Sequence, residues 1–135
     1  IRMVNAAYHY FEQHGKGNIA VISSIAGTKG LGSAPAYSAT KRFQNTYIDA
    51  LDQLAHMKKL NISFTDIRPG FVATPLLKDD KYPLLMHTSQ VASQIVKAIS
   101  RRKRVAIIDW RYQLIVFFWK LIPGWLWVRL PVRNQ

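Results

Sequence analysis

The chain has 135 residues, and its 19 lysines and arginines against 7 acidic residues give a formal net charge of +12. Hydrophobic residues make up 49% of the sequence and aromatic residues 12%, which excludes a disordered basic tail and predicts one domain with a packed core. The absence of cysteine excludes disulfide scaffolds, cysteine-ligated metal centres and thiol catalysis, and it suits the reducing cytoplasm.

The positive charge is concentrated toward the end of the chain. Residues 1–98 carry 11 basic and 6 acidic side chains, whereas residues 99–135 carry 8 basic and 1 acidic side chain. All 4 tryptophans also lie in this last segment. We therefore expect a domain over residues 1–108, followed by a basic aromatic tail over residues 109–135. The first residues show neither a start methionine nor a signal peptide, so we expect the chain to begin within a longer protein.

Hydrophobic periodicity predicts alternating helices and strands. We expect an amphipathic helix over residues 4–14, a strand covered on both faces over residues 18–23 and a long helix over about residues 36–60. A second buried strand over residues 62–67, a helix with Thr88 or Ser89 as its N-cap and a short strand over residues 105–108 follow. The long helix is expected to bury Phe43, Tyr47, Leu51 and Leu54. This order predicts an open α/β sheet with right-handed crossovers.

Tyr37 and Lys41 stand four positions apart at the start of the long helix, so their side chains leave the same face. By itself this spacing is typical of a solvated helix face. Ser24 follows the first strand and lies 13 positions before Tyr37, so both can converge on the crevice where open α/β folds bind ligands. A free tyrosine, with a pKa of about 10, is a poor base at neutral pH, and a neighbouring ammonium group favours its phenolate form.

Three segments resemble successive signatures of the short-chain dehydrogenase/reductase family. They are Ile22-Ser23-Ser24-Ile25-Ala26-Gly27, Tyr37-Ser38-Ala39-Thr40-Lys41 and Pro69-Gly70-Phe71-Val72-Ala73-Thr74. The resemblance covers about residues 1–108 and implies a Rossmann-type doubly wound parallel sheet, of which this chain supplies the C-terminal half. It also implies an oxidoreductase that interconverts an alcohol and a ketone or aldehyde by hydride transfer. The cofactor would be NAD or NADP, which the sequence does not distinguish.

The resemblance also assigns roles to single residues. Tyr37 is implied to be the catalytic acid and base, Lys41 its activator, and Ser24 the hydrogen-bonding partner of the substrate oxygen. Ser23 competes for the role of Ser24, but only Ser24 has the family's spacing to Tyr37. For Pro69 and Gly70 an ordinary strand-ending turn is the alternative to a place in the nicotinamide pocket. The residues implied to bind the cofactor are Tyr37, Lys41, Pro69, Gly70, Val72 and Thr74.

Two features depart from the family pattern. No Gly-rich cofactor loop follows any strand of this sequence, so the chain alone is expected to be inactive. Asn5 lies only 19 positions before Ser24, too close for the family's catalytic asparagine, and is expected to pack within its helix. The alternative function is that of a non-catalytic relative or truncated product acting as a membrane- or partner-binding module. The 4 histidines show no metal-ligand spacing, so no metal site is predicted.

The tail mixes tryptophan, other apolar side chains and cations over residues 110–129, interrupted by Pro123-Gly124. Such a segment suits the surface of a membrane, and the polybasic stretch Arg101-Arg102-Lys103-Arg104 beside it would attract anionic lipid. The alternative is that the tail packs over the domain or a second subunit. We expect a cytoplasmic protein, peripheral on a membrane, with a lipophilic small-molecule substrate and no affinity for nucleic acid. The family also implies a homo-oligomer, with Phe43, Tyr47 and Leu51 facing a partner.

Overall fold

The structure is a computed structural model that describes residues 1–73 and 84–132. Helices and strands alternate as predicted, and the three strands form a parallel sheet in the order β1-β2-β3. The α/β fold class is therefore confirmed. The elements are α1 (Arg2–His14), β1 (Lys16–Ile22), the 3₁₀ helix η1 (Ile25–Gly27), α2 (Pro35–Met57), β2 (Asn61–Arg68), α3 (Thr88–Ser100), β3 (Val105–Ile107), α4 (Trp110–Leu121) and α5 (Gly124–Trp127).

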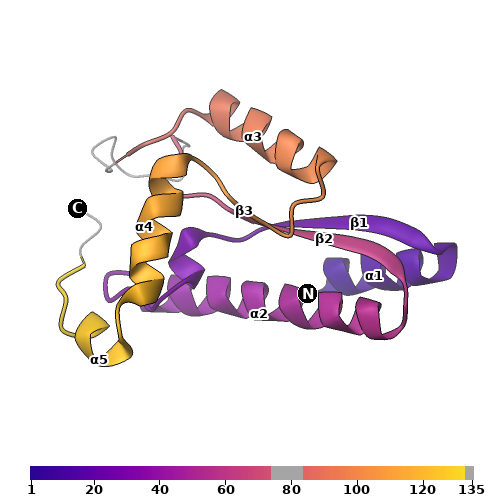
Figure 1. Cartoon of the computed structure of the whole chain (residues 1–135), viewed down its shortest axis with the longest axis horizontal. Helices are drawn as coiled ribbons and strands as arrows, with labels where there is room; N and C mark the ends of the chain where they lie inside the picture. The colour runs from indigo at the N-terminus through magenta and orange to yellow at the C-terminus, as the bar shows by residue number, and fades with distance from the viewer. Residues whose placement is uncertain (74–83, 133–135) are drawn as a thin grey trace.

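Helices cover both faces of this sheet (Figure 1). On one face α1 and α2 contribute Tyr8 and Ile48 to a core that also contains Phe64 of β2. On the other face α3 contributes Val91 to a second core with Ile67 of β2. Phe64 and Ile67 belong to different cores because successive strand residues point to opposite faces. β2 is thus covered on both faces, as its apolar sequence predicts.

β1 is covered less completely than predicted. Ile19 is buried against α1 and α2, but Ala20 is exposed and Ile22 is 56% exposed. α3 reaches β1 at Asn18, whose amide donates to the carbonyl of Ile99 at 3.3 Å. α3 otherwise lies over β2 and β3, so the expectation that both faces of β1 are covered is wrong for the described residues.

The buried side of α2 also differs from the prediction. Leu51 is buried as expected, and Tyr47 and Leu54 are half-buried, but Phe43 is 49% exposed. The polar Asn45 is buried instead, at 2% exposure. Hydrophobic periodicity predicted the wrong buried face for α2, because a pattern of apolar residues does not show that a polar side chain has buried partners.

Three smaller expectations are corrected. α2 ends at Met57, before residue 60, because Lys59 adopts a left-handed conformation with φ of 54°. His87 is the N-cap of α3, so neither Thr88 nor Ser89 caps that helix. Asn5 is exposed on α1, so the packing role expected for it is wrong.

The tail folds back over the domain. Tyr112 and Val116 of α4 are buried in the core beside α3, and Trp127 of α5 packs against Ala26 and Leu31. No helix in the described part of the chain combines the length and apolar character that a membrane crossing requires. Packing over the domain, one of the alternatives weighed for the tail, therefore accounts for its inner face.

Two phenylalanines test these layers. Phe64 is 2% exposed, whereas Phe118 of α4 is 60% exposed. We expect Phe64→Ala to lower the free energy of unfolding by about 3–5 kcal/mol, because it opens a cavity in the α1 and α2 core. Phe118→Ala should change it by less than about 0.5 kcal/mol. Urea unfolding of the whole protein in lipid-free buffer measures both, and equal losses would contradict the layers.

Candidate functional site

Ser24 lies just beyond β1, at the carboxyl end of the sheet, and is 7% exposed. It is the N-cap of η1, where its Oγ accepts a hydrogen bond from the backbone N–H of Ala26 at 3.1 Å. The same Oγ lies 3.4 Å from the carbonyl oxygen of Pro69, and the N–H of Ile25 donates to that carbonyl at 3.2 Å. The serine turn and the Pro69-Gly70 turn are therefore joined.

Tyr37 and Lys41 lie in the first two turns of α2. Tyr37 is 50% exposed, and the Nζ of Lys41 lies 5.6 Å from the centre of its ring. The same Nζ donates to the carbonyl of Ile22, the last residue of β1, at 3.3 Å. The ammonium group thus lies between the tyrosine ring and the strand end that leads to Ser24. This arrangement brings the predicted Tyr37, Lys41 and Ser24 to one edge of the sheet.

The charge of Lys41 is only partly hydrated. Burial lowers the pKa of its ammonium group below the ordinary value, and the negative charge of Asp66 acts against that effect. A partly desolvated cation acts on its neighbours more strongly than one in bulk water. The position of Lys41 therefore suits the stabilisation of a phenolate on Tyr37.

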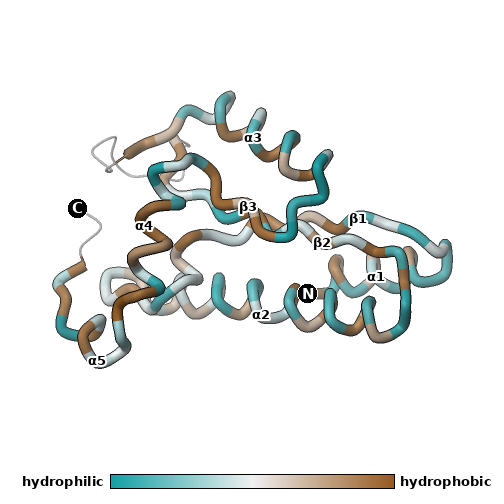
Figure 2. The backbone as a smooth tube through the Cα atoms, viewed as in Figure 1, coloured by the Kyte–Doolittle hydropathy of each residue, from teal (hydrophilic) through white to brown (hydrophobic). Residues whose placement is uncertain are grey.

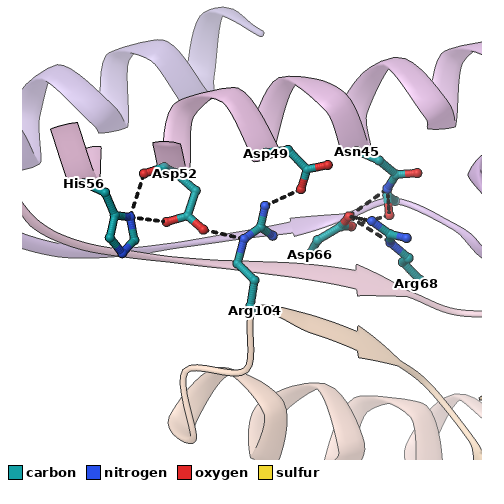
Figure 3. A network of polar contacts seen from close by, with 8 residues as sticks. Asn45, Asp49, Asp52, His56, Asp66, Arg68 and Arg104 are labelled. Carbon is teal, nitrogen blue, oxygen red and sulfur yellow. Dashed lines mark hydrogen bonds and ion pairs between the residues drawn. The ribbon is translucent and has the colours of Figure 1, made fainter. Parts of the chain in front are cut away.

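Ser23 points to the opposite face from Ser24 and is already committed to other partners. Its hydroxyl donates to the Asp66 carboxylate and accepts from the side-chain amide of Asn45 at 2.9 Å. Arg68 donates to the same carboxylate from Nε at 2.9 Å and from Nη2 at 2.6 Å (Figure 3). This buried cluster leaves Ser24 as the hydroxyl that faces the carboxyl end of the sheet, which supports the choice of Ser24 over Ser23.

Gly70 has a structural role that the sequence did not indicate. A Cβ atom at this position would lie 2.2 Å from the ring of Tyr112, so only glycine fits beneath that ring. The hydroxyl of Tyr112 accepts from the N–H of Phe71 and donates to the carbonyl of Leu84, both at 3.1 Å. Burial raises the pKa of the Tyr112 hydroxyl above its ordinary value. Gly70 therefore allows the close approach of α4 to this turn.

The remaining residues predicted to bind the cofactor, Val72 and Thr74, follow this turn in the sequence. Val72 is half-buried and forms a parallel bridge with Met86, where the N–H of Ala73 donates to the Met86 carbonyl at 2.9 Å. This bridge fixes the segment after Gly70. Thr74 lies outside the described residues.

The tail also holds the loop between Ser24 and Tyr37. The indole N–H of Trp127 donates to the carbonyl of Gly30 at 2.7 Å, and Lys29 Nζ donates to the carbonyl of Ile122 at 2.5 Å. Between this loop and the tail lies a groove of about 910 Å³, lined in part by Leu31, Arg42 and Trp127. Ser38 and Arg42, which follow Tyr37 and Lys41 directly in the sequence, also line this groove.

Two residues of the buried cluster could have been singled out from the sequence. Asn45 continues the four-residue spacing of Tyr37 and Lys41 along one helix face. Asp66 is a single acidic residue inside a buried strand, which requires a partner. No such signal pointed to Tyr112. Within residues 1–73 and 84–132, no group of three or more histidine or acidic side chains could hold a metal ion.

Comparison with known proteins agrees with this geometry. The sequence profile described as short chain dehydrogenase matches residues 1–83. An uncharacterized oxidoreductase of Myxococcus xanthus (strain DK1622) is 29% identical over 111 residues, covering 81% of this chain and 43% of that protein. A sepiapterin reductase of Chlorobaculum tepidum is 27% identical over 108 residues, covering 78% of this chain and 43% of that protein. The chain thus spans less than half the length of these curated relatives.

Solved structures share the fold. A short-chain dehydrogenase from Sphingobium yanoikuyae in complex with NADPH superposes with a TM-score of 0.72 at 20% identity, covering 98% of this chain and 52% of that one. The bulky-bulky ketone specific alcohol dehydrogenase from Comamonas testosteroni gives 0.67 at 20% identity, covering 98% of this chain and 50% of that one. These likenesses confirm the Rossmann-type parallel sheet.

The contact between Gly70 and Tyr112 can be tested by a double-mutant cycle in the whole protein. Gly70→Ala should lower the melting temperature, because the new methyl group overlaps the Tyr112 ring. In a Tyr112→Ala background the same substitution should have little effect, since the obstructing ring is gone. Thermal unfolding of the four proteins measures this difference, and an equal effect of Gly70→Ala in both backgrounds would contradict the contact.

Proposed function

The chain belongs to the short-chain dehydrogenase family, whose profile it matches over residues 1–83, and we propose that the whole protein is an NAD(P)-dependent oxidoreductase. Its substrates would be an alcohol and the corresponding ketone or aldehyde. One observation carries the proposal: Lys41 Nζ lies 5.6 Å from the ring centre of Tyr37 and 3.3 Å from the carbonyl that ends β1, two residues before Ser24. The Tyr37 phenol and the Lys41 cation thus lie near the strand end that leads to the Ser24 hydroxyl.

Each residue has a distinct role in the proposed reaction. In alcohol oxidation, Tyr37 acts as the phenolate, whose negative charge the Lys41 ammonium stabilises, and its Oη takes the proton of the substrate hydroxyl to become a neutral phenol. Ser24 donates a hydrogen bond to the substrate oxygen as its charge changes. In the reverse direction Tyr37 returns the proton to that oxygen. The chain's own residues therefore move a proton and orient the oxygen.

The residues at this edge fit a nicotinamide nucleotide. An ammonium group has three N–H donors, and the bond from Lys41 to Ile22 uses one, which leaves donors for ribose hydroxyls. The half-exposed Tyr37 leaves room beside them. Pro69, Gly70 and Val72, with Thr74 placed by sequence alone, would line the nicotinamide pocket. When bound, the nicotinamide ring supplies or accepts the hydride. The NADPH complex of the Sphingobium yanoikuyae relative supports a cofactor of this class without selecting NAD or NADP.

Tyr37→Phe tests the enzymatic role in the whole protein. Loss of the phenolic hydroxyl should lower kcat by about 10²–10⁴-fold, because the proton-transfer group is removed. Cofactor affinity, measured by nucleotide fluorescence, should stay within a few-fold. Tyr47→Phe, on the same helix, is the matched control and should keep wild-type turnover.

The same experiment separates the alternative function. If Tyr37→Phe left turnover unchanged, or if the whole protein bound neither NAD(H) nor NADP(H), the enzyme assignment would fail. A non-catalytic relative or truncated product, acting as a membrane- or partner-binding module, would then be favoured. We propose that residues 1–135 alone lack activity, since no Gly-rich loop follows a strand in this sequence.

We further propose that the outer face of α4 and α5 lies against a membrane surface. Leu114, Phe117, Phe118 and Leu121 follow a helical spacing on α4 and are 50–63% exposed, and Trp125 of α5 is 65% exposed. Figure 2 shows the apolar character of these two helices. Such a face suits the headgroup boundary, where tryptophan and cations accompany apolar side chains. Attachment there would bring the site close to a lipophilic substrate and place the protein peripherally on the cytoplasmic side.

Two of the cations expected within residues 110–129 accompany this face. Arg129 lies beside Trp125, with its guanidinium 5.9 Å from the indole centre, and Lys120 is exposed on α4. The loop that carries Arg101–Arg104 follows the end of α3 and lies away from α5 (Figure 1). Arg104 is also engaged with Asp49 and Asp52 of α2, each at 2.5 Å (Figure 3). Arg101 and Lys103 nevertheless line a pocket together with Gln113 of α4, so the polybasic stretch adjoins the start of the tail and lies away from α5.

Vesicle binding tests this surface. The double variant Phe118→Asn and Leu121→Asn should reduce sedimentation with phosphatidylcholine and phosphatidylserine vesicles by at least about 10-fold, because two large apolar side chains no longer leave water. Met57→Asn with Val96→Asn removes exposed apolar side chains elsewhere and should bind like the wild type. Undiminished binding of the α4 variant, or no binding of the wild type, would contradict the proposal.

A homo-oligomer through α2 is proposed on one further observation. The exposed ring of Phe43 stacks on Tyr47, with the ring centres 6.2 Å apart. The two rings form an apolar patch on the surface of α2, the helix that also carries Tyr37. Leu51, expected on the same surface, is buried in the domain core and does not face a partner.

A further inference from the structure

The carboxylate of Asp66, next to the candidate site, binds three other buried side chains. Asp66, at 0% exposure, accepts from the hydroxyl of Ser23, from the amide of Asn45 at 2.7 Å and twice from the guanidinium of Arg68. Ser23 and Asn45 are each 2% exposed, and Arg68 is 7% exposed (Figure 3). We call Ser23, Asn45, Asp66 and Arg68 the Asp66 cluster.

Each member of the Asp66 cluster stands next to a segment of the candidate site. Ser23 directly precedes Ser24, and Arg68 directly precedes Pro69. Asn45 lies one turn beyond Lys41 on the same face of α2. The Asn45 amide also donates to the Ser23 hydroxyl at 2.9 Å, so one side chain of α2 binds both β1 and β2. The cluster therefore connects all three segments from which the site is built.

Close packing at Gly27 also holds the turn that follows Ser24 against α2. A Cβ atom on Gly27 of η1 would lie 2.2 Å from Asn45 Oδ1 and 2.9 Å from the backbone carbon of Lys41. The turn capped by Ser24 therefore rests directly on the turn of α2 between Lys41 and Asn45. A shift of the Asn45 side chain would move this contact, and with it the position of Ser24 relative to Lys41.

Stability alone gives a weak reason for four buried polar side chains. A buried ion pair contributes little compared with well-packed apolar residues of similar volume. The negative charge of Asp66 additionally favours the charged form of Lys41, which burial disfavours. The cluster therefore suits a role in geometry and charge placement better than a role in stability.

We propose that the Asp66 cluster positions the catalytic residues and that Asn45 is its central positioning residue, linking Tyr37 and Lys41 on α2 to the serine turn. The inference rests on the proposed function, since it assigns a role within that reaction. Asn45 does not touch the substrate. It acts through Ser23, Asp66 and the Gly27 contact.

Exchanging the side chains of Asn45 and Asp66 tests this role in the cofactor-loaded whole protein. Asn45→Asp places a second carboxylate against Asp66, and should lower kcat by about 100-fold while changing KM by less than a few-fold, because misplacement acts on the reacting groups. Adding Asp66→Asn restores one carboxylate and one amide in exchanged places. The double variant should recover at least 10-fold of the lost kcat.

Two controls separate positioning from stability. Leu51→Ala, buried on the same helix away from the cluster, should lower the melting temperature but leave the kcat of the folded enzyme unchanged. Should Asn45→Asp not fold, Asn45→Leu replaces it. This near-isosteric change leaves Ser23, Asp66 and Arg68 paired with one another and should also lower kcat.

These experiments distinguish failure of the positioning role from failure of the proposed function. Loss of turnover in Tyr37→Phe together with unchanged turnover in Asn45→Leu would overturn the positioning role alone. A double variant no more active than Asn45→Asp, or a kcat loss in Leu51→Ala equal to that in the Asn45 variants, would also overturn it. Unchanged turnover in Tyr37→Phe would overturn the proposed function itself.

Discussion

Parallel pairing between β1 and β2 determines where the candidate site residues lie. The register places Ile22 opposite Ile67, and the ladder continues through the N–H of Ser23, which donates to the Ile67 carbonyl at 2.7 Å. Since both strands end at the same edge, Ser24 and Pro69 emerge side by side there. A register shift of one residue would turn Ser23 toward the open edge and bury Ser24 against α2. The choice between the two serines is thus a consequence of strand pairing.

The sequence predicted the order of the α-helices and strands described up to residue 108, because the helices show hydrophobic periodicity and the strands are short apolar runs. It did not predict the 3₁₀ helix η1. The errors arose where burial depends on neighbours remote in sequence. Ile22 is as apolar as Ile67, yet α3 covers β2 and leaves the end of β1 exposed. Phe43 was expected to be buried for its hydrophobicity, whereas Asn45 is the buried residue, and its amide binds the side chains of Ser23 and Asp66. Local patterns cannot contain that information.

The candidate site, like the fold, could be predicted from the sequence only in part. The positions of Tyr37 and Lys41 follow from helical spacing, and the structure adds the contact of Lys41 with the end of β1. The roles of these residues stay predictions until turnover is measured. The contact of Tyr112 with Gly70 joins positions 42 residues apart, and no spacing rule connects them. What sequence reasoning lacked was this long-range packing, which decides why a glycine stands after Pro69.

The contacts that hold the loop before Tyr37 have a consequence for the order of folding. Trp127 bonds to Gly30 across 97 positions, and Lys29 to Ile122 across 93. Closing loops of this length carries an entropy cost that only the completed contacts offset. During synthesis the strands and α2 leave the ribosome well before Trp127. The loop therefore reaches its final conformation late, after the sheet below it has formed, when the last turn of the tail docks.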